Sequence, residues 1–130
     1  MKRSFADILA GLNSDRARKV ARKLPEWAAV DAARRAAGLD PLEFPTALSL
    51  EQCSSSATAA YKAFLAGQAA AAQLIQLIID LTGGLGVDSW AMSRVAERVV
   101  YFERDAELAA AAERNFRRLG RLVSRSAARR

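Results

Sequence analysis

Three glycines stand close together between two acidic residues in the stretch D-L-T-G-G-L-G-V-D, residues 80–88. Gly83, Gly84 and Gly86 can adopt backbone conformations that other residues avoid, and they let a ligand approach the main chain. A glycine-rich turn between a strand and a helix is typical of nucleotide and nucleoside sites. The alternative is a tight turn that only reverses the chain.

An acidic residue ends each of two apolar runs beside this turn. Asp80 ends L-I-Q-L-I-I-D, and Glu103 ends R-V-V-Y-F-E. A carboxylate at Glu103 can accept hydrogen bonds from both hydroxyls of a ribose. A carboxylate at Asp80 would repel the pyrophosphate of a dinucleotide and attract the cationic amino-acid end of S-adenosylmethionine.

Charge therefore favours S-adenosylmethionine as the ligand. A nicotinamide-type dinucleotide is the alternative, because Gly84, Gly86 and Ser89 nearly match the pattern G-x-G-x-x-G.

The order of elements around the turn predicts half of a doubly wound α/β sheet. The dense Leu and Ile of residues 74–80 indicate a strand buried on both faces. A helix is expected over 87–95 and a second strand over 98–103. Asp105 can cap a further helix that ends before Gly120.

The remaining parts of the chain are predicted from their composition and from the positions of proline and glycine, which interrupt helices and strands. Residues 1–66 form a helical N-terminal region, in which Pro25 opens a helix and the proline-containing segment 39–49 is a loop. Residues 67–120 form a partial Rossmann-like domain. Residues 121–130 have no apolar period strong enough for a third strand and are expected to be a basic tail.

Composition limits the chemistry further. The 130 residues are 52% hydrophobic and contain no histidine, which excludes Ser-His-Asp and Cys-His catalysis and His-bearing zinc sites within this chain. No metal is expected. Cys53 is the single cysteine, so an intramolecular disulfide is excluded and a reducing compartment fits. Gly67, Gln68 and other interruptions make the longest apolar segment a poor membrane span, and we expect a cytoplasmic protein.

Positive charge is concentrated at both ends. The net charge is +6; residues 1–37 carry nine basic and four acidic groups, 38–93 one and five, and 94–130 ten and five. Basic flanks attract polyanions such as RNA. The alternative function is therefore a non-enzymatic basic helical module that binds nucleic acid or a protein. Its main basic cluster comprises Arg16, Arg18, Lys19, Arg22 and Lys23.

Five stretches in the same order resemble one known family. They are A-R-K-L-P-E-W-A (21–28), L-S-L-E-Q-C-S-S-S-A-T-A-A-Y-K-A (48–63), D-L-T-G-G-L-G-V-D-S (80–89), Y-F-E-R-D (101–105) and N-F-R-R-L-G (115–120). Together they resemble the class I S-adenosylmethionine-dependent methyltransferases that carry a THUMP-like domain.

The resemblance implies a Rossmann-like cofactor domain after a helical region, with methyl transfer to RNA. It implies that Glu103 binds the ribose and that Asp88 lies near the methionine end of the cofactor. The first cofactor motif would comprise Asp80, Thr82, Gly83, Gly84 and Gly86. It gives no physical role to Glu51, Gln52 or Cys53, and it identifies no catalytic residue.

The resemblance covers roughly residues 20–120. Enzymes of this family continue through several more strands, including a proline-containing motif that contacts the acceptor. All three prolines here, Pro25, Pro41 and Pro45, precede the glycine turn. We therefore expect an N-terminal fragment that keeps the cofactor-binding half, lacks the acceptor-binding half and is inactive alone. Its open sheet edges could allow self-association.

Overall fold

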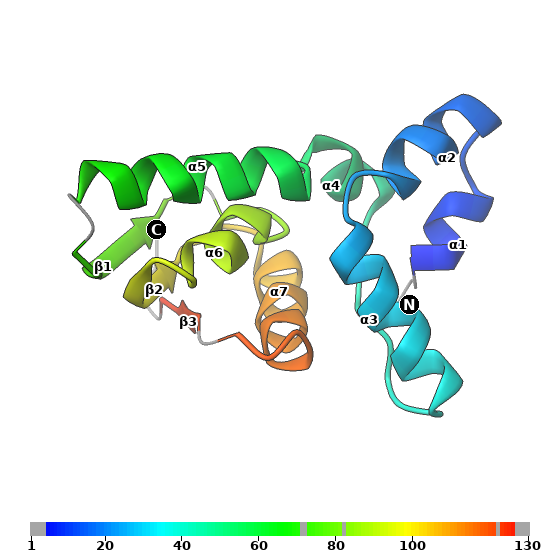
Figure 1. The fold of residues 1–130 in the computed structure, drawn as a ribbon. Coiled ribbons are helices and arrows are strands. Elements are labelled where there is room, and N and C mark those ends of the chain that lie inside the picture. Colours follow the sequence, from blue (N-terminus) through cyan, green and yellow to red (C-terminus); the bar gives the residue numbers. More distant parts are fainter. Residues whose placement is uncertain (1–4, 71–72, 82, 122, 127–130) are drawn as a thin grey trace.

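The computed structural model describes residues 5–70, 73–81, 83–121 and 123–126. Helices fill the first half of the chain, and strands alternate with helices in the second half (Figure 1). In chain order the described elements are α1 (Phe5–Ala10), α2 (Ser14–Ala21), α3 (Pro25–Ala36), α4 (Ala47–Gln52), α5 (Ser56–Ala69), β1 (Ile75–Asp80), α6 (Val87–Met92), β2 (Ala96–Tyr101), α7 (Ala106–Arg118) and β3 (Ser124–Arg125).

The three strands form one parallel sheet in the order β1-β2-β3. The register pairs Ile75 with Ala96 and Asp80 with Tyr101, so both long strands end together. The buried residues Val99 and Tyr101 of β2 share a face of this sheet with Ile78. A parallel sheet with helices between its strands confirms the predicted α/β fold class.

Local signals account for most helix starts. Pro25 occupies the first turn of α3, and Asp105 caps α7 by accepting hydrogen bonds from the backbone N–H groups of Glu107 and Leu108. Ser55 caps α5 in the same way through the N–H of Thr58. These short-range contacts explain why composition and spacing predict the helices well.

Two elements differ from the prediction. The loop predicted over 39–49 ends at Thr46, because the Thr46 hydroxyl caps α4 by accepting from Ser49 N at 3.0 Å. The stretch predicted to be a basic tail contains β3. This strand pairs with β2 through backbone groups, for example by Ser126 N donating to Tyr101 O at 2.9 Å. Such pairing does not require alternating hydrophobic residues, which is why the sequence pattern did not reveal the strand.

Aromatic side chains join the N-terminal helices to the sheet region in one core. Trp27 of α3 is fully buried and packs edge-on against Trp90 of α6, with ring centroids 5.9 Å apart. Trp27 also contacts Phe44, which lies in the segment between α3 and α4, and Phe44 in turn contacts Phe5 of α1. The helical region therefore packs on the Rossmann-like unit through a shared hydrophobic interior.

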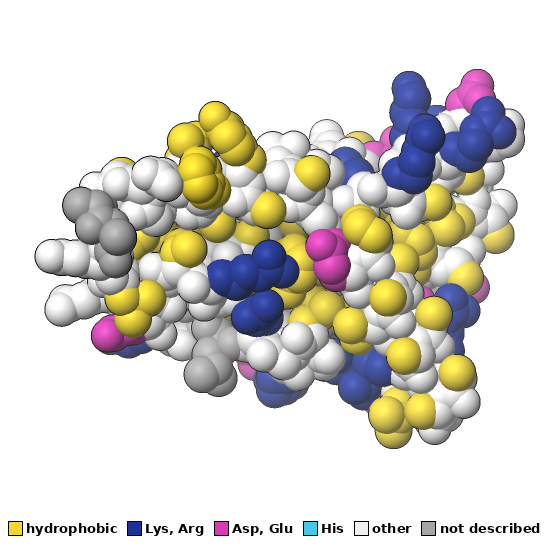
Figure 2. Space-filling model, in the orientation of Figure 1, with side chains coloured by type: hydrophobic (Ala, Val, Ile, Leu, Met, Phe, Trp, Pro, Cys, Tyr) yellow, Lys and Arg dark blue, Asp and Glu magenta, His cyan; other side chains and the backbone are white. Residues whose placement is uncertain are grey.

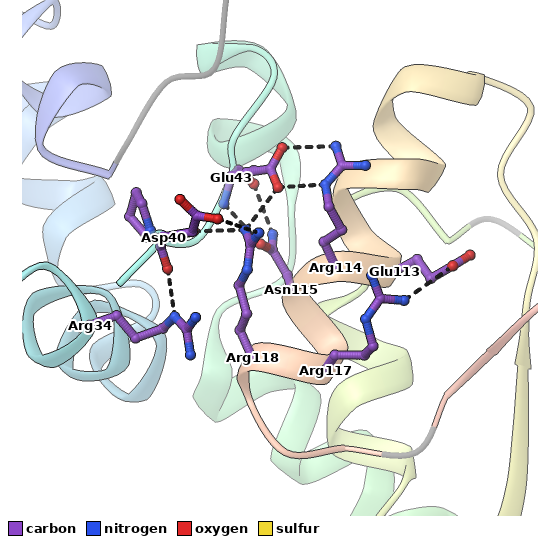
Figure 3. Close-up of polar contacts among 9 residues, drawn as sticks. Arg34, Asp40, Glu43, Glu113, Arg114, Asn115, Arg117 and Arg118 are labelled. Carbon is purple, nitrogen blue, oxygen red and sulfur yellow. Dashed lines mark hydrogen bonds and ion pairs between the residues drawn. The ribbon is translucent and has the colours of Figure 1, made fainter. Parts of the chain in front are cut away.

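The segment after α3 is also attached to α7 by a buried polar cluster, the Glu43 clamp, which comprises Glu43, Arg114, Asn115 and Arg118 (Figure 3). Arg114 and Arg118 both donate to the Glu43 carboxylate. The Asn115 amide accepts from Glu43 N and donates to Glu43 O, both at 2.8 Å. Glu43 and Asn115 are buried, whereas the side chains of Arg114 and Arg118 are 33% and 14% exposed, so the clamp attaches the segment after α3 to α7 through partly solvated ion pairs.

No helix in the described ranges is both long enough and apolar enough to cross a bilayer.

Candidate functional site

The glycine loop lies at the carboxyl ends of β1 and β2. Asp80 is the last residue of β1, and the loop leads directly into α6 at Val87. Gly83 N donates to Phe102 O at 2.8 Å, and the Tyr101 hydroxyl donates to Gly84 O. These bonds attach the loop to the end of the neighbouring strand, which is where α/β sheets bind ligands.

Two of the glycines are required by close packing. A Cβ atom at Gly83 would lie 2.1 Å from Cε2 of Tyr101, and one at Gly86 would lie 2.3 Å from Cζ of Phe116. Gly86 also has a φ of +92°, in the left-handed region. The loop can therefore lie flat on the two rings only with glycine at these positions.

The Glu103 carboxylate contacts the glycine loop. Its Oε1 accepts from Gly84 N at 2.9 Å, and its Oε2 accepts from Asp105 N at 2.8 Å. An ionised carboxylate offers about four acceptor positions, so two remain for the hydroxyls of a ribose. Glu103 thus holds the loop in place and still has two acceptor positions, the number that binding both hydroxyls of a ribose requires.

Asp80 lies at the carboxyl end of β1, where the sequence places it, and contacts α6. Its Oδ2 accepts from the buried hydroxyl of Ser89 in α6 at 2.6 Å, and Asp80 is not among the residues that line the pocket described below. The carboxylate therefore orients the start of α6. The pKa of the Tyr101 phenol is raised, mainly by burial and to a smaller extent by the negative charges of Glu103 and Asp80. The phenol therefore stays protonated and donates its hydrogen bond to Gly84.

A pocket with a cavity volume of about 510 Å³ opens on the glycine loop. One wall comprises Gly83, Gly84, Leu85, Gly86, Val87, Asp88, Glu103, Asp105 and Leu108. The structure thus brings together five of the predicted cofactor residues: Gly83, Gly84, Gly86, Asp88 and Glu103. The predicted Thr82 lies outside the described residues.

The opposite wall comes from α4 and the turn that follows it, and the sequence did not predict it. It comprises Thr46, Leu48, Ser49, Gln52, Cys53 and Ser54. Gln52 and Cys53 therefore face the pocket, whereas Glu51 forms an ion pair with Arg16 of α2. No short-range signal marks this wall, because these residues lie about thirty positions before the loop and reach it only through packing.

Cys53 does not have the properties of a nucleophile. Burial raises the pKa of its thiol to about 11, and the nearby Lys23 lowers it only in part. Its Sγ donates to Leu50 O at 3.0 Å. The thiol is therefore protonated near neutral pH and contributes to the wall by packing.

The pocket lining is acidic. Asp88, Glu103 and Asp105 contribute carboxylates, and the described lining includes no Lys or Arg. Such a lining favours a ligand that carries positive charge and disfavours a pyrophosphate. Within the described ranges there is also no group of acidic and cysteine side chains that could hold a metal ion.

Comparison with known proteins gives one informative similarity. No family model matches the chain, and no curated protein matches it. The chain is similar to a crystal structure from Porphyromonas gingivalis W83 that is ascribed to a methyltransferase, with 32% sequence identity and a TM-score of 0.56. The alignment covers 94% of this chain and 31% of that one.

The chain has a methyltransferase-type fold. It spans less than a third of the length of the methyltransferase that it matches. In this methyltransferase-type fold the glycine loop and Glu103 lie beyond the carboxyl ends of β1 and β2. The narrower resemblance to methyltransferases with a THUMP-like domain stays a prediction.

Proposed function

We propose that the chain is the cofactor-binding part of an S-adenosylmethionine-dependent methyltransferase. One observation carries the proposal: the glycine loop and Glu103 line the same pocket, with Glu103 Oε1 only 2.9 Å from Gly84 N. The 32% identity to a methyltransferase structure supports the same activity. The cavity of about 510 Å³ lies in the range of small-molecule sites.

The residues of the pocket suit the parts of this cofactor. Glu103 offers acceptors to the ribose hydroxyls, and the bare backbone at Gly84 and Gly86 permits close approach. The carboxylates of the lining attract the cationic sulfonium group. When bound, S-adenosylmethionine supplies an activated methyl group, and this chain binds and orients it.

For the methyl acceptor we propose RNA. The family resemblance implies this substrate, and the net charge of +6 supports it. The competing interpretation, a purely helical basic module, accounts for neither the glycine loop nor the pocket, and three of its five basic residues have partners within the chain. Arg16 pairs with Glu51, Arg18 pairs with Asp15, and Lys23 donates to the carbonyl of Leu50.

Calorimetric titration with S-adenosylhomocysteine tests cofactor binding. We expect the wild-type chain to bind and Glu103→Gln to bind about ten- to a hundredfold more weakly, because hydrogen bonds to a charged group contribute about 1.5–3 kcal/mol. The glutamine keeps the size of the side chain and removes its charge.

The matched control for this titration is Glu97→Gln, which removes an exposed carboxylate from β2 outside the pocket. It should leave the affinity unchanged. Absence of binding by the wild-type chain would refute the proposed function. Equal affinities of wild type and Glu103→Gln would refute the role of Glu103.

A further inference from the structure

Two aromatic side chains of α5 lie exposed next to each other and form what we call the aromatic pair, Tyr61 and Phe64. They are 61% and 56% exposed, and their rings stack with centroids 6.4 Å apart and an interplanar angle of 23°. The core side of the same helix is formed by small residues, Ala59 and Ala63, which are buried. The aromatic pair therefore adds little to the core and offers flat ring surfaces to a ligand.

The helix that carries the aromatic pair begins beside the basic end of α2. Ser56 N, in the first residue of α5, donates to Lys23 O at 2.8 Å. Lys19 and Arg22, near the end of α2, are exposed. The aromatic pair follows Ser56 by five and eight residues, which is about 7–12 Å along the helix axis. In Figure 2, Lys and Arg side chains over α2 and hydrophobic side chains over α5 lie along the same edge of the molecule, so one extended ligand can contact both.

The charge of α5 also suits a polyanion. The helix contains no acidic residue, and its one charged residue is Lys62. Lys62 donates from Nζ to Asp88 Oδ2 at 3.1 Å and to Ser54 Oγ at 3.2 Å, and both of these partners line the pocket. The helix that carries the aromatic pair is thus attached to both walls of the pocket.

Single-stranded RNA has the chemistry that these features match. Its unpaired bases stack on aromatic side chains, and its phosphates contact Lys and Arg. The bases of a duplex are already stacked within the helix, so their faces are closed to the protein. An apolar protein segment could cover the rings, but it would make no use of the basic end of α2.

We propose that Tyr61 and Phe64 stack unpaired bases of the RNA acceptor, while Lys19 and Arg22 hold its phosphates. This inference rests on the RNA acceptor of the proposed function and adds to it a base-contacting surface on α5.

Fluorescence anisotropy with a labelled single-stranded RNA and with an abasic strand of equal length separates stacking from phosphate contacts. We expect the double variant Tyr61→Leu, Phe64→Leu to weaken RNA binding at least about tenfold, because it removes both ring surfaces. The abasic strand should bind wild type and variant equally, since leucine keeps the surface apolar and changes no charge. The slope of log affinity against log salt should stay the same, because no phosphate contact is lost. Tyr61→Phe should keep the wild-type affinity.

Leu65→Ala, at an exposed aliphatic residue of the same helix, is the matched control and should change neither affinity. Unchanged binding of the abasic strand shows that each variant is folded. Equal RNA affinities of wild type and the leucine variant, equal losses for both strands, or a wild type that does not bind the RNA would each overturn the inference. Titration of the same proteins with S-adenosylhomocysteine keeps the two proposals apart: absence of cofactor binding refutes the proposed cofactor role, whereas a ring-dependent loss of RNA binding still supports the surface on α5.

Discussion

At the scale of single residues, the same groups serve packing and binding. Gly83 and Gly86 allow the loop to lie on Tyr101 and Phe116, and the loop so placed presents its backbone to the pocket. Glu103 holds Gly84 N and also offers acceptors to a ligand. A substitution of Gly83 or Gly86 is therefore expected to lower the stability of the protein as well as its affinity for a ligand.

Gly83→Ala should destabilise the protein strongly. The new methyl group would lie 2.1 Å from the Tyr101 ring and 2.7 Å from Phe102 O, and neither atom can move without disturbing the end of β2. We expect a loss of about 2 kcal/mol or more in the free energy of unfolding, measured by urea denaturation.

The matched control for this substitution is Gly11→Ala. A Cβ atom there meets only ordinary contacts, at 3.7 Å and beyond. It should change the stability by less than about 1 kcal/mol. Equal urea midpoints for the two variants would contradict the packing argument.

At the scale of elements, β1 exposes an apolar face. It occupies the edge of the sheet, and Leu77 and Ile79 on one face are 45% and 53% exposed. Leu74 and Leu81, at either end of the strand, are exposed as well. Parallel sheets are normally covered on both faces, and we propose that this exposed apolar strand allows association.

We expect the chain to self-associate through β1 as its concentration rises. In an antiparallel pair of copies centred on Ile78, Leu77 would face Ile79 and Gln76 would face Asp80, so no like charges would oppose each other. Sedimentation velocity should show a growing average mass for the wild type. The double variant Leu77→Lys, Ile79→Lys, which places like charges opposite each other in this pairing, should remain monomeric.

Tyr61→Glu is the matched control, because Tyr61 is an exposed hydrophobic residue, at 61%, that lies on α5, where Figure 2 shows hydrophobic side chains at the surface. It should associate like the wild type. A wild type that stays monomeric at every concentration, or a β1 variant that associates equally well, would contradict this role of β1.

At the scale of the whole molecule, charge is divided between regions. Lys and Arg side chains gather over α2 in Figure 2, whereas the pocket lining carries only acidic charges. Within the described ranges, Lys19 of α2 and Arg22, which directly follows this helix, are exposed and have no side-chain partner. A polyanionic acceptor would therefore be held by the helical region, at a distance from the acidic cofactor pocket.

RNA binding should weaken as salt rises. Each phosphate contact to a single strand contributes about 0.7 to the slope of log affinity against log salt, so Lys19→Gln with Arg22→Gln should reduce that slope by about 1.4. Fluorescence anisotropy with a labelled single-stranded RNA measures it. Arg98→Gln, at an exposed arginine of β2, serves as the control. An affinity that is independent of salt would exclude this mode of binding.

The sequence by itself determined the parallel strands, the glycine loop, the Asp105 cap and the placement of Glu103 beside the loop. The glycine loop and the Asp105 cap depend on backbone preferences and near neighbours, and the strands and Glu103 belong to one strand–helix–strand unit of about thirty residues, whose order the spacing indicates. Only the tertiary structure decided the α4 wall, the contact of Lys62 with Asp88 and the pairing of Asp80 with Ser89. The first two depend on how the shared aromatic core and the Glu43 clamp, whose partners lie more than seventy residues apart, pack distant segments together, and the third depends on the direction in which α6 leaves the loop.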